Sequence, residues 1–345
     1  MASRVVITGL GVTAPNGVGV PQFLEAIKNG ESGIEHQEQL EQMRFSCQVA
    51  GKPKLSTELI EKYFSPLELR NFNSTGILYG VIAGMEAWQD AGLPLPTGEE
   101  PDWDSGTIFG TGTSGIEKFR EAIYKIDQQD LRKLGSSVVI QTMASGISAY
   151  LGGKLGLGNQ VSTNSSACAT GTEAILMAYE RIKSGQALRM LAGSTSDSGP
   201  YIWAGFDAMK VCTFKHNQEA KKGSRPMSAS ASGFVPGSGA GALLLESLES
   251  ALARGTYIYA ELLGGHVNSG GQRGRGSMTA PNTLAVQKCI LKALQNAGVE
   301  AKDVDAINGH LTATTMDSSE INNWVTALGR NGKDFPYINT LKGMT

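Results

Sequence analysis

Three residues of this sequence combine reactive side chains with positions at the ends of predicted elements. Cys168 lies in "TNSSACATGTEAI", where a strand-like segment gives way to a helical pattern. His310 and Lys342 each follow a short apolar run, in "DAINGHLTATT" and "YINTLKGMT". A thiol that ionises is a strong nucleophile, so the first question is whether the chain holds Cys168 in a setting that favours its thiolate.

The residues after Cys168 predict a helix that begins close to it. Apolar side chains recur there at helical spacing, at Ala174, Ile175, Ala178 and Ile182, and Gly185 supplies a stop. Asn164, Ser165 and Ser166 are candidates for the N-cap. A thiolate near the first turn would be stabilised by unpaired N–H groups and the helix dipole. The alternative is a small, inert, buried cysteine.

His310 and Lys342 are candidates for the same site because of where their strands end. Side chains at the carboxyl ends of parallel strands face the crevice in which ligands bind. Thr312 and Thr314 alternate with His310 and would offer hydroxyl groups there. Taken singly, His310 could be an ordinary loop histidine and Lys342 a solvated surface charge.

Composition limits the class of protein. A chain of 345 residues with 41% hydrophobic residues and 44 glycines predicts about two domains or one large α/β body. A net charge of −2 argues against bulk nucleic-acid binding. The four cysteines show no metal-ligand spacing and favour a reducing, cytoplasmic setting. The N-terminus reads as a strand and loop rather than a signal peptide, and no apolar run is long enough to span a membrane.

Alternating strand and helix patterns predict an α/β fold with a mostly parallel sheet. Strands are expected at 4–10, 105–112, 188–194, 241–247, 257–264, 304–310 and 336–343. Helices are expected at 21–30, at 75–92, after Cys168 and at 282–299. "TIFGTGTSG" and "AINGHLTATT" echo each other weakly, as two related βαβαβ halves would. The glycine-rich loops lack the spacing of nucleotide-binding motifs.

Five segments in order carry a resemblance to a known family. They are "RVVITGLGVTAPNG", "SSACATGTEAI", "GSRPMSASASGFVPGSGAGALLLES", "GHLTATTMDSSE" and "KGMT". The chain resembles the β-ketoacyl-[acyl-carrier-protein] synthases, the condensing enzymes of fatty acid and polyketide synthesis. The resemblance implies a thiolase-like fold with two related halves in five α-β-α-β-α layers. The first half would span 1–255 and the second, incomplete as the chain stands, 256–345.

The resemblance also assigns roles to residues. Cys168 would accept the acyl group, His310 and a second family histidine would stabilise the enolate of malonate, and Lys342 would hold that region electrostatically. Other positions would bind substrate: Thr312, Thr314 and Thr279 along the pantetheine arm, and Phe234 beside the cavity. No metal or redox cofactor is implied, because the phosphopantetheine arrives on the acyl carrier protein.

The resemblance further implies a homodimer, or a heterodimer with a related subunit, formed through the strand in "NQVSTN". The sequence departs from the family pattern at three places. Residues 227–232 carry no charge, Leu311 stands where the family has glycine, and Asp317 comes one residue early. The family's second histidine would follow Thr345, so we expect further residues there, beginning with a Gly-His pair.

Other classes remain open at this point. A non-condensing dimer partner of the chain-length-factor type typically lacks the nucleophile, which Cys168 argues against. A scaffold subunit on the same fold is a second alternative, since fold does not determine function. A thiolase would need a second cysteine in a glycine-rich motif, which Cys212 and Cys289 lack. Acyl chain length and unsaturation are undetermined, and the variant motifs favour a polyketide or polyene pathway over fatty acid synthesis.

Overall fold

A computed structural model describes residues 3–270 and 279–345, and it divides into two units. Unit 1 is formed by Met1–Gly33, Gly51–Gly205 and Gly237–Leu262. Unit 2 is formed by Ile34–Ala50, Phe206–Pro236 and Leu263–Thr345. The sequence predicted two related halves that meet at 255/256. The two units are each built from three segments of the chain and do not test that division, which stays a prediction.

Unit 1 is built on a seven-stranded sheet in the order β2-β1-β8-β7-β5-β6, with β9 also paired to β1. Its strands are β1 (Val5–Ala14), β2 (Gly17–Val18), β5 (Ser105–Thr111), β6 (Val161–Ser162), β7 (Arg189–Ser196), β8 (Gly239–Ser247) and β9 (Ala260–Leu262). The predicted strands at 4–10, 105–112, 188–194 and 241–247 are confirmed, each within a few residues.

The expectation of a mostly parallel sheet is wrong for unit 1. β5 runs parallel to β6 and β7, but β8 runs antiparallel to both β1 and β7. Gly239 at the start of β8 pairs with Ser196 at the end of β7, so the chain re-enters the sheet at the end where it left. A parallel strand would require the connection to return to the opposite end, usually through a helix.

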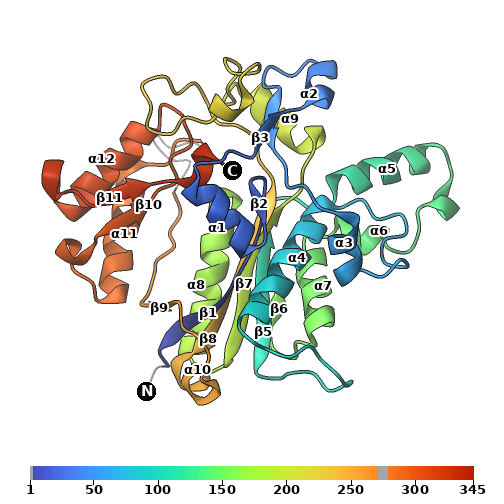
Figure 1. Cartoon of the computed structure of the whole chain (residues 1–345), viewed down its shortest axis with the longest axis horizontal. Helices are drawn as coiled ribbons and strands as arrows, with labels where there is room; N and C mark the ends of the chain where they lie inside the picture. Colours follow the sequence, from blue (N-terminus) through green and yellow to red (C-terminus); the bar gives the residue numbers. More distant parts are fainter. Residues whose placement is uncertain (1–2, 271–278) are drawn as a thin grey trace. The chain divides into compact units, whose positions relative to one another are not determined.

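Helices cover both faces of this sheet (Figure 1). Leu191 of β7 belongs to a buried cluster with α4 (Thr75–Asp90) and α7 (Gly146–Leu155). The residues on either side of it, Met190 and Ala192, pack instead against α8 (Thr170–Lys183). The alternation is the pleat of a strand that is buried on both faces.

The remaining helical segments connect the strands. In unit 1 they are α1 (Val20–Lys28), α3 (Thr57–Tyr63), α5 (Ile116–Asp127), η1 (Leu131–Lys133), α6 (Val138–Thr142), η2 (Ala167–Ala169) and α10 (Leu248–Arg254). α9 (Pro200–Ala208) ends in the first residues of unit 2. The predicted helices at 21–30, at 75–92 and after Cys168 are therefore confirmed. No helix of the described ranges is long and apolar enough to cross a bilayer.

Glycines in β1 let α4 pack directly against the strand. A Cβ atom at Gly11 would lie 1.9 Å from the carbonyl oxygen of Ala83, and one at Gly9 would lie 2.0 Å from that of Ala87. Both neighbours are backbone atoms of α4, which cannot move aside without shifting the helix. The close packing of α4 therefore depends on the absence of side chains at these two positions.

We expect Gly11→Ala to destabilise the protein by about 3 kcal/mol, because the added methyl overpacks the core against rigid backbone. Gly241→Ala is the matched control: Gly241 pairs with Val12 on the adjacent strand, and its Cβ would meet nothing within 4 Å. Urea unfolding of both variants measures the difference. Equal midpoints for the two variants would contradict this account of the β1–α4 packing.

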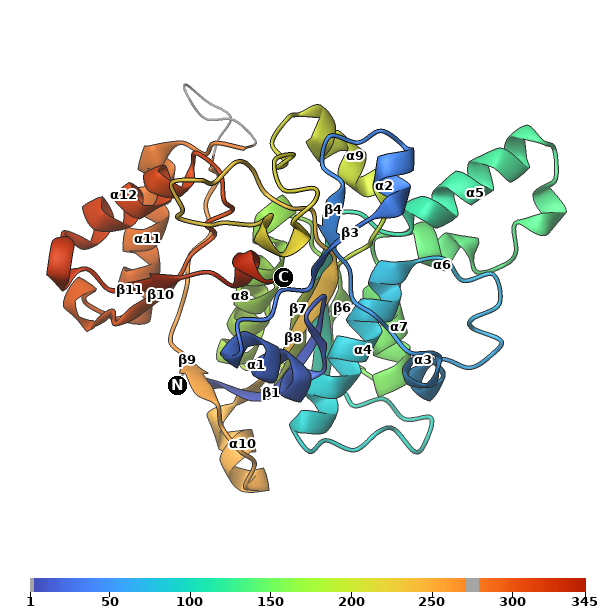
Figure 2. The ribbon, with the colours of Figure 1, turned by 45° about the horizontal axis from the view of Figure 1, so that its top comes forward.

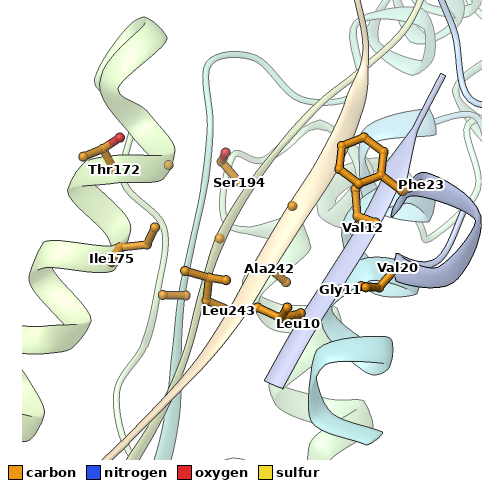
Figure 3. A pocket seen from close by; sticks show the side chains of 14 residues that line it. Leu10, Gly11, Val12, Val20, Phe23, Thr172, Ile175, Ser194, Ala242 and Leu243 are labelled. Atoms are coloured by element: carbon orange, nitrogen blue, oxygen red, sulfur yellow. The ribbon is translucent and has the colours of Figure 1, made fainter. Parts of the chain in front are cut away.

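The small residues of β7 and β8 also leave a hollow beside α8. This groove of about 450 Å³ lies over the sheet between α8 and α1 (Figure 3). Leu10, Val12, Phe23, Ile175 and Leu243 are among its apolar walls, and the hydroxyls of Thr172 and Ser194 border it. One stretch of the unit 1 sheet is therefore covered by neither α8 nor α1.

Unit 2 contains a parallel strand pair, β10 (Ala306–Asn308) and β11 (Tyr337–Asn339), packed against α11 (Thr283–Ala297) and α12 (Asp317–Leu328) (Figure 2). A second small sheet joins β3 (Ile34–His36) to β4 (Val49–Gly51). The other segments are α2 (Glu38–Gln42), η3 (Ala220–Lys222), η4 (Ala301–Asp303), η5 (Gly332–Asp334) and η6 (Leu341–Gly343). The predicted strand at 336–343 is shorter than expected, and Lys342 lies in η6.

Candidate active site

Cys168 is the middle residue of η2, a single turn that stands immediately before α8. Its side chain is exposed, whereas Cys47 and Cys212 are buried. Ala167 before it has a left-handed backbone with φ of 49°. A non-glycine residue in that region stores strain, which is common where a chain is bent to present a reactive side chain. The structure therefore rejects the alternative of a small buried cysteine at position 168.

Thr170 ties this turn together, and the predicted N-caps do not. The Thr170 hydroxyl accepts a hydrogen bond from the Ser166 N–H at 2.8 Å and donates to the Ala167 carbonyl at 2.7 Å. The N-cap position of α8 is Ala169, with no side-chain hydrogen bond, so the expectation of capping by Asn164, Ser165 or Ser166 is wrong. The turn η2 stands between these residues and the start of α8, and the Asn164 side-chain amide donates to the Thr170 carbonyl at 2.9 Å instead of accepting from a helix N–H.

Gly110 of β5 lies directly beneath the turn. A Cβ atom at this position would lie 2.2 Å from Cγ2 of Thr170 and 2.4 Å from Oδ1 of Asn164. Sequence reasoning missed this residue as part of the site. Its only signal is a glycine inside a β-branched strand, which often marks the close approach of another segment.

The His310 loop in unit 2 is held by two carboxylates from the first turn of α12. Glu320 accepts hydrogen bonds from the backbone N–H groups of His310 at 2.7 Å and Leu311 at 2.8 Å. Asp317 accepts from Thr312 at 2.9 Å and from Met227 at 2.9 Å. Charge-assisted bonds of this kind are stronger than neutral ones, so α12 fixes the loop by its backbone.

The departure of Leu311 from the family glycine has a structural cost. Leu311 has a φ of 23°, in the region that favours glycine, and its side chain is fully buried. Ala313, also buried, has a φ of 62°. The two backbone bonds to Glu320 and the burial of the leucine side chain together offset the strain.

The electrostatic surroundings keep His310 neutral near pH 7. Although the residue retains solvent exposure, desolvation by the surrounding chain lowers the pKa of its imidazole below the usual value. The Lys342 ammonium lowers this pKa further, while the Glu320 and Asp317 carboxylates act in the opposite direction. A neutral imidazole has one N–H donor to offer an oxygen atom of a substrate.

Lys342→Met is expected to raise the pKa of His310, because it removes a positive charge that disfavours the imidazolium. Glu320→Gln should lower that pKa, because it removes a negative charge that favours the imidazolium. In Lys342→Met, His310 would become protonated at a higher pH than in the wild type. Because the neutral imidazole is the active form, the loss of activity on the acid side should also move to higher pH. NMR titration of the His310 ring in the two variants tests the signs; shifts in the same direction would contradict this arrangement.

The other predicted residues of unit 2 gather around the same loop, with one exception. The Thr312 and Thr314 hydroxyls lie 3.2 Å apart. The N–H of Gly233, the residue before Phe234, donates to the carbonyl of Ala313 in the loop at 3.0 Å. Thr279 is exposed before α11, and the first four residues of its "RGSMTAPN" segment lie outside the described residues.

The sites predicted from sequence thus fall into two groups. His310, Lys342, Thr312, Thr314 and Phe234 belong to unit 2, and Cys168 belongs to unit 1. Sequence reasoning noted Asp317 as a departure from the family pattern but missed that Asp317 and Glu320 hold the loop. Two acidic residues in the first turn of a helix were the available signal, since that position favours negative charge.

Comparisons with known proteins identify the family of the chain. The β-ketoacyl synthase N-terminal domain matches residues 2–251, and the β-ketoacyl synthase C-terminal domain matches residues 259–345. The 3-oxoacyl-[acyl-carrier-protein] synthase 2 of Vibrio cholerae is 33% identical over 99% of this chain and 81% of its own length. The chloroplastic 3-oxoacyl-[acyl-carrier-protein] synthase I of Arabidopsis thaliana is 33% identical over 92% of this chain and 67% of its own length.

Solved structures show the same α/β, thiolase-like fold. A type II polyketide ketosynthase in complex with its acyl-carrier protein has a TM-score of 0.85 at 29% identity, covering 100% of this chain and 82% of its own. A β-ketoacyl synthase from Burkholderia phymatum has a TM-score of 0.85 at 27% identity, covering 99% of this chain and 81% of its own. The chain therefore belongs to the β-ketoacyl synthase family of condensing acyltransferases.

Proposed function

We propose that this chain catalyses a decarboxylative Claisen condensation. An acyl thioester is transferred to Cys168 and then joined to malonyl-acyl-carrier protein, giving β-ketoacyl-acyl-carrier protein for fatty acid or polyketide synthesis. The observation that carries the proposal is the exposed Cys168 on a strained turn before α8, in a chain of the condensing family.

In the first half-reaction the Cys168 thiolate attacks the acyl thioester. The carbonyl oxygen becomes an oxyanion, the C–S bond to the carrier breaks, and the carrier leaves as a thiolate that takes a proton from solvent. Backbone N–H groups at the start of a helix have no partners within the helix and suit a developing anion. The amides around η2 and the first turn of α8 are the candidates for this role.

In the second half-reaction malonyl-carrier protein loses carbon dioxide. The electron pair of the broken C–C bond forms an enolate, whose oxygen needs hydrogen-bond donors. The neutral His310 imidazole supplies an N–H, and the Lys342 ammonium beside it adds favourable charge. The enolate carbon then attacks the acyl group on Cys168, and the thiolate leaves, ready for another cycle.

The proposed partner is an acyl carrier protein, whose phosphopantetheine arm brings the thioester. A structural relative was solved in complex with its own carrier, which supports this assignment. Thr312, Thr314 and Thr279 would contact the arm, and Phe234 would border the acyl cavity. The proposed chemistry uses no resident metal or redox cofactor. We further propose a cytoplasmic setting, supported by four unbridged thiols.

The direct test is a reconstituted reaction of the full chain with acyl- and malonyl-carrier protein. Mass spectrometry of the carrier should show the β-ketoacyl product. Mass spectrometry of the enzyme should show an acyl adduct on Cys168. A series of acyl chains of different length and unsaturation distinguishes fatty acid from polyketide or polyene synthesis. The variant segment 227–232 and Leu311 favour polyketide or polyene synthesis. An enzyme that neither binds an acyl group nor releases product would support the non-condensing partner or scaffold.

We also propose that the chain forms a dimer through β6. β6 is the last strand in the sheet order, so among the described strands it pairs only with β5. Val161 of β6 is 38% exposed, and the exposed backbone of an edge strand is a template for pairing with a second chain. The partner would be a second copy or a closely related subunit.

A dimer that continues the sheet would have a large, obligate interface, above roughly 2,000 Å². Val161→Lys is therefore expected to shift the protein toward monomer, because a charge on an edge strand opposes pairing. Leu252→Lys, at an exposed position on α10, should leave the dimer intact. Light scattering at micromolar concentration measures both, and a wild-type monomer would exclude the interface.

A further inference from the structure

Two cysteines that the proposed reaction does not use lie together in unit 2. Cys47 and Cys212 are 1% and 5% exposed and belong to one apolar cluster, with Ile34, Val49 and Phe234 around them. Their side chains interact directly. A hydrogen bond from Cys212 lowers the pKa of the Cys47 thiol, while the same contact and burial raise the pKa of Cys212. The Cys47 thiol also donates a hydrogen bond to the carbonyl of Val49 at 3.4 Å, and of the two thiols Cys47 is the one whose pKa is lowered.

The two backbone segments are held together on both sides of the thiols. The Asp207 carboxylate accepts hydrogen bonds from the N–H groups of Ser46 and Cys47, both at 2.9 Å. The Asn217 side chain accepts from the N–H of Gln48 at 3.0 Å and donates to the carbonyl of Ser46 at 3.0 Å. These contacts hold the segment of Cys47 against residues on either side of Cys212 in the sequence.

We propose that Cys47 and Cys212 are a site of reversible disulfide formation, with a peroxide as the oxidant. The Cys47 thiolate attacks one peroxide oxygen, the O–O bond breaks, and the leaving hydroxide takes a proton to become water. The Cys212 sulfur then attacks the resulting sulfenic acid and expels its oxygen as a second water, which takes the Cys212 proton. Two thiols and one hydrogen peroxide give one disulfide and two waters.

The other two cysteines lack this arrangement. Cys168 is exposed on its turn in unit 1. Cys289 is half-buried, and its thiol donates to the carbonyl of His266 at 3.3 Å. Cys289 is therefore the matched control for a partly buried thiol without a cysteine partner.

The crosslink would reach the His310 loop through a short chain of hydrogen bonds, a consequence that rests on the proposed function. Thr213, next to Cys212, donates its N–H to the carbonyl of Phe234 at 3.0 Å, and Phe234 donates its own to Val211 at 3.0 Å. Gly233 then donates to Ala313 within the loop. A disulfide would tie these two hydrogen-bonded segments to the segment Ile34–Ala50 and restrict the movement of Phe234, so condensation should slow several-fold.

The test is peroxide titration of the full chain, followed by digestion without reductant and mass spectrometry. We expect a peptide pair that joins Cys47 to Cys212, two hydrogens lighter than its separate parts and released by dithiothreitol. The midpoint of thermal unfolding should rise by about 5 °C on oxidation, because the crosslink restricts the unfolded chain. A Cys168→Ser background removes side reactions at the exposed thiol, and the experiment is run in both forms.

Cys47→Ser and Cys212→Ser should each abolish the crosslink and the thermal shift, while Cys289→Ser should leave both. The proposal is overturned if Cys47 and Cys212 of the oxidised wild-type chain alkylate after denaturation as readily as Cys289 does. Because the crosslink is detected by mass, its failure is distinct from a failure of the proposed reaction, which the reduced wild-type enzyme tests. A crosslink that forms without slowing condensation would overturn the coupling to Phe234.

Discussion

Cys168→Ala is expected to abolish condensation, with a loss on the order of 10⁴-fold or more, because it removes the atom that carries the acyl group between the two half-reactions. No other thiol is placed to replace it. Cys47 and Cys212 are buried in unit 2, and Cys289 bonds to a backbone carbonyl. The variant should fold normally, since the side chain of Cys168 is exposed.

Three measurements test whether Cys168 is the nucleophile. Intact mass of the wild-type enzyme after incubation with acyl-carrier protein should show one acyl group, which is absent from Cys168→Ala. Iodoacetamide should modify Cys168 before the other three cysteines and stop the reaction. Cys289→Ala should retain both the adduct and the activity. Full activity of Cys168→Ala would exclude covalent catalysis at this residue.

His310→Ala is expected to block decarboxylation of malonyl-carrier protein by a factor on the order of 10² to 10³, the usual effect of removing one donor to a developing oxyanion. Acylation of Cys168 should survive. The setting of Cys168 before α8 belongs to unit 1, and the bonds that shape its turn come from Thr170 rather than from His310. The two half-reactions should therefore respond differently to this substitution.

The two half-reactions can be followed separately. The acyl adduct is read by mass, and carbon dioxide release is read from malonyl-carrier protein. His310→Gln, which keeps an N–H donor, should recover part of the decarboxylation, whereas His266→Ala in the same unit should behave as wild type. Loss of acylation with intact decarboxylation would reverse the assignment and make His310 the base that activates the thiol.

The loop that carries His310 shows how positive φ can be held at residues other than glycine. Leu311 and Ala313 both have positive φ, yet neither is glycine. Backbone N–H groups of the loop donate hydrogen bonds to Glu320 and Asp317 of α12, and these bonds hold the strained conformation. The sequence does not relieve the strain by placing glycine at these two positions. The structure thus accounts for a departure that the motif alone leaves unexplained.

Much of the fold was determined by local sequence. The helix at 75–92, the helix after Cys168 and the helix at 282–299 follow from apolar spacing with glycine at or near their ends, which acts within one segment. The strand positions in unit 1 follow from β-branched runs for the same reason. The family motifs around Cys168 and His310 are also local in sequence, because each is a short run of residues at fixed spacing, although the positive φ of Ala167, Leu311 and Ala313 does not follow from their residue types.

Only the tertiary structure decided the features that depend on distant segments. The antiparallel direction of β8 depends on the path of the connection after β7, which residue patterns do not encode. Gly11 and Gly110 have no room for a Cβ atom only because α4 and the Cys168 turn approach those strands. The hydrogen bond from the His310 backbone to Glu320 likewise forms only when separate segments pack, and so does the cluster that contains Cys47 and Cys212. Such contacts are set by the free energy of the packed whole, so neither spacing nor composition predicts them.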